Sequence, residues 1–519
     1  MTRNSMKTLI IAAIAAASAL AADSQLGAPA AEAIKSGKRA EAIDMIAKKS
    51  ADVNAAEAYG STAILWAASG NDADLVSRLL KAGANPTVRN QLGATPLTEA
   101  AFNANTEMIK ALLDAGADPN AQGADGQTPL MIVARTANVD AAKLLLTKGA
   151  NPNVKEVQRE QTALMWAAAS SQGPMVRLLL AGGAQPDAAT ATDLMTPLIS
   201  REPRAQPRSP GGMTAMLFAV REGCMECVKA LLEYGAKIDM PDPEGVTPLI
   251  SAIFNAHFDV AKYLIEKGAN VDRWDWWGRS PLYLAVDYNT LPHGGRPDQP
   301  SLDETLPIDL ARILLERGAN PNLQLKLAIP YRATGADRGA DGLLSIGTTP
   351  LLRAAKAQDA PAIKLLLEHG AIIDLPNNQG MTPTVAASGA GSSDRDTRGN
   401  YRAADVQDRA IASLELLLQH GGRLNGRAGR QQQAPLHGTA LWGWNKVAAF
   451  LIAKGADVNV PDSRGLTPLD YAQGRGGSPG TTQPLDGRKE IADLLISKGG
   501  IAGTPVPQPG GRPGGPPGR

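Results

Sequence analysis

Two kinds of short apolar stretch alternate along most of the chain, separated by polar residues. The first kind opens with Thr-Pro-Leu and continues with an Ala pair, as in the segment 95–101. The second kind carries a Leu pair, as at 112–113, and ends at a Gly, here Gly116. Thr caps a helix by accepting a backbone N–H, Pro fits the first helical position, and Gly tolerates the left-handed conformation at a helix end. The pattern therefore predicts a helix, a turn, a second helix and a hairpin-like loop.

The same pattern recurs with a fixed period, which marks an internal repeat. The capping position falls at Thr62, Thr95, Thr128, Thr162, Thr214, Thr247, Ser280, Thr349, Thr382, Ala434 and Thr467. Six of the ten spacings between these positions are 33 residues, and the longer spacings contain inserted segments. Small Ala side chains let the first helices approach closely and the Leu pairs supply a core, so each repeat is expected to pack on its neighbours.

Thr-Pro-Leu-x-x-Ala-Ala followed by Leu-Leu-x-x-Gly-Ala-Asx, at this period, resembles the ankyrin-repeat family over about residues 29–499. The resemblance implies an all-α repeat solenoid of helix-turn-helix repeats with β-hairpin-like finger loops. We expect about twelve units, including a degenerate cap at 29–49 and a C-terminal cap, in one curved superhelix over residues 22–501. The His that often follows Thr-Pro-Leu in the family is present only as His437, and its replacement elsewhere changes local hydrogen bonding without threatening the fold.

Five segments interrupt the period, namely residues 185–211, 289–307, 323–346, 390–409 and 474–487. Insertions of this kind map to exposed turns and cost little entropy as they lengthen. Residues 502–519 are rich in Pro and Gly and cannot bury a core, so we expect a disordered tail there.

The first 21 residues have the features of a secretory signal peptide. Arg3 and Lys7 precede an apolar run at 9–17, and residues 19–21 provide an Ala-x-Ala cleavage site. No later stretch has the length and hydrophobicity of a transmembrane helix. We therefore expect a secreted bacterial protein, soluble in the periplasm or released from the cell, without membrane insertion.

Composition and charge exclude several functions. The chain has 52 Lys and Arg against 51 Asp and Glu, without the basic stripe of a nucleic-acid-binding protein. Aromatic residues make up 4%, which is low for one large central core and natural for stacked small-residue repeats. Net charge therefore indicates no partner class.

The two cysteines, Cys224 and Cys227, lie at the expected start of a second helix. Cys227 aligns with core positions of other repeats, so it should be buried. Three interpretations remain open: a structural disulfide, two free core thiols, or a redox pair activated by the helix N-terminus. The strand that precedes a thioredoxin-like motif is missing, and two cysteines without further ligands cannot close a zinc site.

Two short motifs resemble catalytic or metal-binding sites, but each lacks the structural context or the ligands that such a site requires. Residues 476–480 match the serine-hydrolase elbow by letter but lie in an inserted loop. Residues 394–405 imitate a calcium loop without its full set of oxygen ligands. The five His are scattered and suit structural roles. We expect no enzyme, no metal and no cofactor.

The family resemblance implies binding through finger tips and the exposed face of each first helix, and Trp and Arg dominate binding hot spots. The candidate contact residues are Trp276, Trp277 and Arg279 at one finger tip, Phe254, Asp287 and Tyr288 on the concave surface beside it, and Trp442 and Trp444 in a second, weaker patch. The alternative is that the insertions at 289–307 and 323–346 cover these rings. Trp66 and Trp166 follow the core pattern, and we interpret both as packing residues.

The sequence therefore predicts a monomeric, non-enzymatic scaffold that binds another protein outside the cytoplasm. Two other functions remain open. One is a periplasmic thiol/disulfide redox protein that uses Cys224 and Cys227, and the other is a secreted effector that binds a protein of a foreign cell.

Overall fold

The computed structural model describes residues 28–192, 211–290, 301–327, 343–392, 403–477 and 487–506. These residues contain twenty-four helices, from α2 (Pro29–Lys35) to α25 (Gly487–Ser497), and the β-structure among them is confined to isolated bridges. The predicted signal peptide at 1–21 lies outside the described residues. The architecture is the all-α repeat solenoid that the sequence predicted.

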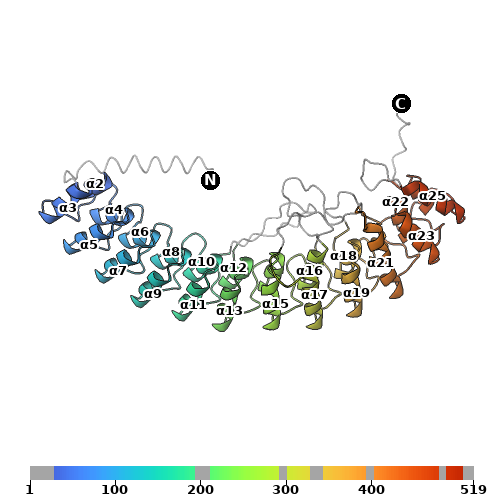
Figure 1. Ribbon diagram of the computed structural model, residues 1–519, viewed down its shortest axis with the longest axis horizontal. Helices are drawn as coiled ribbons and strands as arrows, with labels where there is room; N and C mark the ends of the chain where they lie inside the picture. Colours follow the sequence, from blue (N-terminus) through green and yellow to red (C-terminus); the bar gives the residue numbers. More distant parts are fainter. Residues whose placement is uncertain are drawn as a thin grey trace, which may run out of the picture. The chain divides into compact units, whose positions relative to one another are not determined.

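The chain forms two compact units, of which unit 1 includes the described residues up to 192 together with 211–237. Its first helices are α2, α4 (Ala63–Ser69), α6 (Pro96–Phe102), α8 (Pro129–Arg135), α10 (Ala163–Ala169) and α12 (Ala215–Arg221). Its second helices are α3 (Arg39–Ala47), α5 (Ala73–Lys81), α7 (Thr106–Asp114), α9 (Val139–Thr147), α11 (Gly173–Ala181) and α13 (Met225–Glu233). The first helices form one row and the second helices form another, each helix packing on the next of its row (Figure 1).

Unit 2 holds the described residues from 238 onward and repeats this two-row arrangement. Its first helices are α14 (Pro248–Phe254), α16 (Pro281–Asn289), α18 (Pro350–Lys356), α20 (Pro383–Ala387), α22 (Pro435–Trp442) and α24 (Pro468–Ala472). Its second helices are α15 (Phe258–Glu266), α17 (Pro307–Glu316), α19 (Ala360–Glu368), α21 (Val406–Gln419), α23 (Asn445–Ala453) and α25. The prediction of a single superhelix through both units stays a prediction.

Helices begin where the sequence places their caps. The Thr95 hydroxyl accepts the Thr98 N–H at 3.1 Å, and Pro96 occupies the first helical position of α6. Second helices begin at an Asx residue in several repeats; the Asn105 side chain, for example, accepts the Met108 N–H at 3.0 Å. The Ala pair at 100–101 is fully buried between neighbouring first helices, as its small size suggested. Local capping and small-residue packing together set the repeat.

Several finger loops are held by an Asx side chain and by the preceding finger. The Asn90 carboxamide oxygen accepts the N–H groups of Leu92 at 3.0 Å and Ala94 at 2.9 Å, which closes the turn at the tip. The Gln91 N–H donates to the carbonyl of Tyr59 in the finger before it, at 3.0 Å. Several consecutive fingers within each unit are therefore linked tip to tip by a backbone hydrogen bond.

The interruptions are narrower than predicted. Helix α21 begins at Val406, inside the insertion assigned to 390–409, because its first turn extends the apolar face of the second helix. The tail also begins later than residue 502, since the Val506 N–H donates to the Arg464 carbonyl at 2.8 Å and so continues the tip-to-tip finger contacts. Residues 507–519 lie outside the described residues.

Candidate protein-binding surfaces

The finger that leads into α16 is organised around a buried carboxylate. Asp275 Oδ1 accepts the backbone N–H groups of Trp277 at 3.0 Å and Arg279 at 2.9 Å. Asp275 Oδ2 accepts the Arg279 Nε–H at 2.6 Å, so the two charges form an ion pair away from water. One acidic side chain therefore closes the turn and also fixes the arginine.

Arg279 and Trp277 are packing residues, and the prediction that they are exposed is wrong. The guanidinium carbon of Arg279 lies 4.7 Å from the ring centroid of Phe254 and 4.7 Å from that of Trp277. Trp277 is only 3% exposed. The physical reason is that Asp275 neutralises the guanidinium, which can then be buried between two aromatic faces.

The exposed part of this finger consists of Trp274 and Trp276, which are 50% and 43% exposed. They stand two residues apart, on either side of buried Asp275, and the Trp276 N–H donates to the Glu244 carbonyl of the preceding finger at 2.7 Å. The Lys326 Nζ lies 5.6 Å from the Trp274 ring centroid. The sequence prediction chose Trp276 but missed Trp274, although alternation along an extended loop puts residues two apart on one side.

Asp287 does not face a partner as predicted. It lies buried on α16, and its Oδ1 accepts the Nε–H of buried Arg353 on α18 at 2.5 Å. Tyr288 and Phe254 remain partly exposed, and the Tyr288 hydroxyl donates to the Phe254 carbonyl at 2.5 Å. A cation from the next repeat therefore removes Asp287 from the surface, while a binding role for Phe254 and Tyr288 stays a prediction.

Trp442 and Trp444 do not form a second exposed patch. Both rings are buried and stack on each other with centroids 6.2 Å apart. The Trp442 Nε1–H donates to the Gly389 carbonyl at 2.9 Å. Gly389 has a φ of +85°, and a Cβ there would lie 2.6 Å from the Trp442 ring, so the absence of a side chain at 389 makes room for the indole.

Cys224 and Cys227 are joined as a disulfide, the first of the three interpretations. Cys224 is the N-cap residue of α13, where its Sγ accepts the Cys227 N–H at 3.2 Å. Both residues are buried. A redox reaction needs a sulfur that an attacking thiolate can reach, and this burial disfavours that role.

The first helices of unit 1 carry a set of cation–aromatic contacts that the sequence prediction missed. The Arg135 guanidinium carbon lies 5.0 Å from the Trp166 ring centroid, and that of Arg221 lies 5.0 Å from the Phe218 ring. Phe102, at the end of α6, is 50% exposed. Trp166 is partly exposed rather than enclosed, so it is a surface residue as well as a packing residue. The sequence could have indicated these contacts, because the residues stand four or seven positions after the capping Thr of their repeat.

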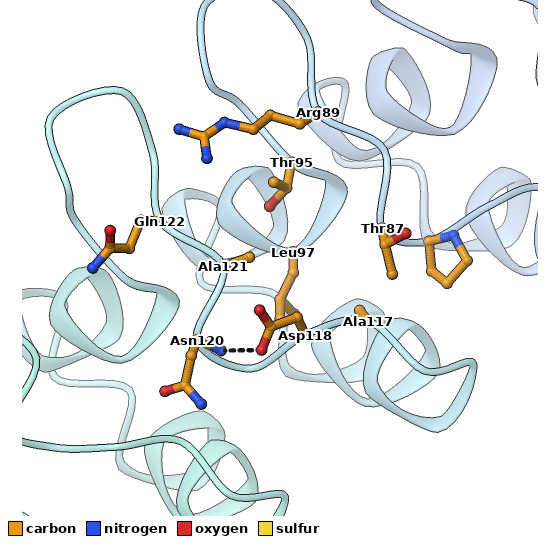
Figure 2. A pocket seen from close by; sticks show the side chains of 10 residues that line it. Thr87, Arg89, Thr95, Leu97, Ala117, Asp118, Asn120, Ala121 and Gln122 are labelled. Carbon is orange, nitrogen blue, oxygen red and sulfur yellow. Dashed lines mark hydrogen bonds between the residues drawn. The ribbon is translucent and has the colours of Figure 1, made fainter.

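A pocket of about 320 Å³ lies between two consecutive fingers of unit 1 (Figure 2). Arg89 and Gln122 come from the two fingers, and Thr95 and Leu97 from the start of α6 between them. Asp118 and other polar groups of this pocket hold the loops themselves, as in the bond from the Asn120 N–H to Asp118 Oδ1 at 2.9 Å. We assign no ligand to this pocket.

None of the described helices combines the length and apolar content needed to cross a bilayer. Within the same ranges, no three side chains among His, Cys, Asp and Glu are placed to hold a metal ion.

Comparison with known proteins agrees with the repeat architecture. Models of ankyrin repeats in three copies match residues 30–123, 119–190, 187–275 and 242–325, which is more than half of the chain. A model of the single ankyrin repeat matches residues 346–378. The human ankyrin repeat and SOCS box protein 16 is 28% identical over 203 residues, which cover 34% of this chain and 40% of that protein. The chain thus spans less than half the length of this curated relative.

Proposed function

The chain belongs to the ankyrin-repeat family, and on this premise we propose that it is a non-enzymatic protein-binding scaffold that acts outside the cytoplasm. The observation that carries the proposal is the exposed indole pair of Trp274 and Trp276 at one finger tip. Two large aromatic side chains that remain half-exposed in a folded chain mark a contact surface, because Trp supplies much of the binding energy in protein interfaces.

The structure of the finger suits this role. Asp275 closes the turn and the sandwiched Arg279 anchors its base, so the two exposed indoles project from a pre-organised loop. A loop that is already ordered loses little conformational entropy when it binds. Finger rigidity therefore favours recognition by Trp274 and Trp276.

Location outside the cytoplasm rests on two supports. The first is the signal-peptide pattern at residues 1–21. The second is the disulfide between Cys224 and Cys227, since disulfides persist in oxidising compartments such as the bacterial periplasm. Cell fractionation tests this part of the proposal: a processed protein in the periplasmic fraction supports it, and an unprocessed protein in the cytoplasm contradicts it. Accumulation in the culture medium instead favours the secreted effector.

Crosslinking pull-down from the cell envelope tests the binding site. Trp274→Ala/Trp276→Ala should reduce capture of a specific protein by at least about tenfold relative to wild type, as expected for a hot spot. Tyr234→Ala is the matched control, because Tyr234 is also 43% exposed but belongs to unit 1. Equal loss in both variants, or full capture by the double variant, would show that the finger is not the contact site.

A further inference from the structure

Five side chains of unit 1 share one register on consecutive first helices, and we call them the inner row: Phe102 on α6, Arg135 on α8, Trp166 on α10, and Phe218 and Arg221 on α12. Each lies four or seven residues after its capping Thr, and positions three apart lie on the same face of a helix. Helices α6, α8, α10 and α12 pack in this order (Figure 1). The inner row therefore runs across four consecutive repeats.

The inner row alternates cationic and aromatic groups. Arg135 is exposed and reaches across to the Trp166 ring of the next repeat, while exposed Arg221 covers the buried ring of Phe218 on its own helix. A guanidinium that lies over an aromatic face keeps the N–H donors at its edge available to a carboxylate. The contact with Trp166 thus leaves the edge donors of Arg135 available to a carboxylate, whereas Arg221 is already engaged by Glu222.

The inner row and the finger that leads into α10 carry two exposed arginines without an ion pair among the described residues. Arg135 has no carboxylate within ion-pair distance among the described residues, and the same holds for Arg159, which is exposed on the finger that leads into α10. Arg221 is paired with its neighbour Glu222 at 3.0 Å. Glu99, partly exposed on α6, is the carboxylate at the opposite end of the row. Arg135 therefore presents an unneutralised positive charge over the Trp166 ring. Arg159 adds a second one on the finger that leads into α10, where its backbone N–H donates to the carboxylate of buried Glu156 at 2.7 Å.

We infer that the inner row binds an extended acidic segment of a partner protein. Carboxylates of the segment pair with Arg135 and Arg159, and an apolar side chain of the segment packs on Phe102. The inference rests on the proposed function as a protein-binding scaffold and adds a second surface with a defined partner chemistry. Glu99 sets the direction of the segment, because acidic residues are repelled at the α6 end and attracted toward α10.

The Arg135 guanidinium over the Trp166 indole favours a carboxylate by geometry as well as by charge. The planar fork of Arg matches both oxygens of a carboxylate, and such charge-assisted pairs are stronger than neutral hydrogen bonds. Contact between exposed charges weakens as salt rises, since the Debye length shortens. Binding at the inner row should therefore be selective for Glu over Gln and sensitive to ionic strength.

Fluorescence anisotropy with the full mature chain tests the inference. The probe is a fluorescein-labelled peptide that alternates Glu with Ser and contains one Leu, and its control has Gln at every Glu position. Wild type should bind the Glu peptide at least about tenfold more tightly than the Gln peptide, with affinity falling as salt is added. Arg135→Gln/Arg159→Gln should weaken binding of the Glu peptide by about tenfold.

Lys81→Gln/Lys143→Gln is the matched control, because it removes the same charge from exposed positions on α5 and α9 of unit 1. If both double variants lose affinity equally, bulk charge explains the binding and the inference is overturned. Equal binding of the Glu and Gln peptides would overturn it too, as would binding to vesicles of anionic phosphatidylglycerol in place of the peptide.

Failure of this inference can be separated from failure of the proposed function. A partner whose capture depends on Trp274 and Trp276, in a protein that does not bind the Glu peptide, would leave the scaffold function standing and reject the acidic segment. Binding of the Glu peptide through Arg135 without any Trp-dependent capture would support the inner row and reject the finger.

Discussion

His437 is the His of the repeat motif that follows Pro435-Leu436, and its environment determines which ring nitrogen carries the proton. Its Nδ1 accepts the Ala434 N–H at 3.0 Å, so the proton must be on Nε2, which contacts the Leu466 carbonyl at 3.1 Å. A second proton on Nδ1 would face an N–H donor. Burial lowers the pKa of His437 below its ordinary value of 6.5, although the backbone contacts act in the opposite direction.

The lowered pKa of His437 predicts a loss of stability in mild acid. The unfolded chain takes up a proton at this residue as the pH falls below about 6.5, whereas the folded chain resists it, so acid favours unfolding. Between about pH 7 and pH 5, the free energy of unfolding of the wild type should fall more steeply than that of His437→Gln. Urea titrations at a series of pH values measure this slope, and parallel slopes for the two proteins would contradict the assignment.

At the scale of the helix, three first turns share a hydrogen bond that different residues provide. In these turns the backbone N–H at the capping position donates to the side chain three residues later. The acceptor is Thr98 Oγ1 in α6 at 2.9 Å, His437 in α22, and Asp470 Oδ2 in α24 at 2.6 Å. Elsewhere an apolar residue stands three positions after the capping Thr, as Met131 does in α8, and the helix still begins there because the Thr128 hydroxyl accepts the Met131 N–H at 3.3 Å. Loss of the family His therefore removes one hydrogen bond without loss of the helix.

The start of α13 is distinctive because a cysteine caps it. We predict that Cys224 and Cys227 resist alkylation in the native protein without reductant, since they are joined and buried. Mass spectrometry after labelling under native and denaturing conditions measures this. Cys224→Ser/Cys227→Ala keeps a capping oxygen while it removes the cross-link, and should cost at most about 2 kcal/mol because the closed loop is short. Rapid, reversible reduction of the native protein would instead favour the redox function.

At the scale of the whole molecule, Asn side chains connect successive repeats within each unit. In unit 1, Asn153 Nδ2 donates to the Gly183 carbonyl at 2.9 Å, and its Oδ1 accepts the Gln185 N–H at 2.8 Å. In unit 2, Asn322 makes the same two bonds to Gly370 and Ile372, at 3.0 and 2.8 Å. Each of these carboxamides forms hydrogen bonds with a backbone carbonyl at the end of one second helix and with a backbone N–H at the start of the loop that follows it. The Asn side chain therefore couples neighbouring repeats.

Removing one of these connections should weaken both stability and cooperativity. Asn153→Ala loses a donor and an acceptor and should lower the free energy of unfolding by about 2 kcal/mol. Asn153→Asp keeps the acceptor and should lose about half as much. Because a solenoid is stabilised through nearest-neighbour interfaces, the urea transition of Asn153→Ala should also broaden. An unchanged midpoint for Asn153→Ala would show that these Asn side chains do not couple the repeats.

Sequence reasoning identified the repeat, its caps and its core because those signals lie within single 33-residue units. A capping Thr, a Pro at the first helical position and a Gly after the second helix act on their immediate neighbours, so their effect can be read locally. The same reasoning placed Trp276 at a finger tip, where the structure exposes it.

Exposure of the candidate site could not be read in this way, because it depends on residues far along the chain. Asp287 is neutralised by Arg353, which lies 66 residues later, and Trp442 is buried against Gly389, 53 residues earlier. Arg279 is enclosed because Phe254 reaches it from the preceding repeat. Local chemistry thus specifies the repeat and its ends, whereas the stacking of one repeat on another selects which tryptophans and arginines stay in water, since burial is a property of neighbours in space.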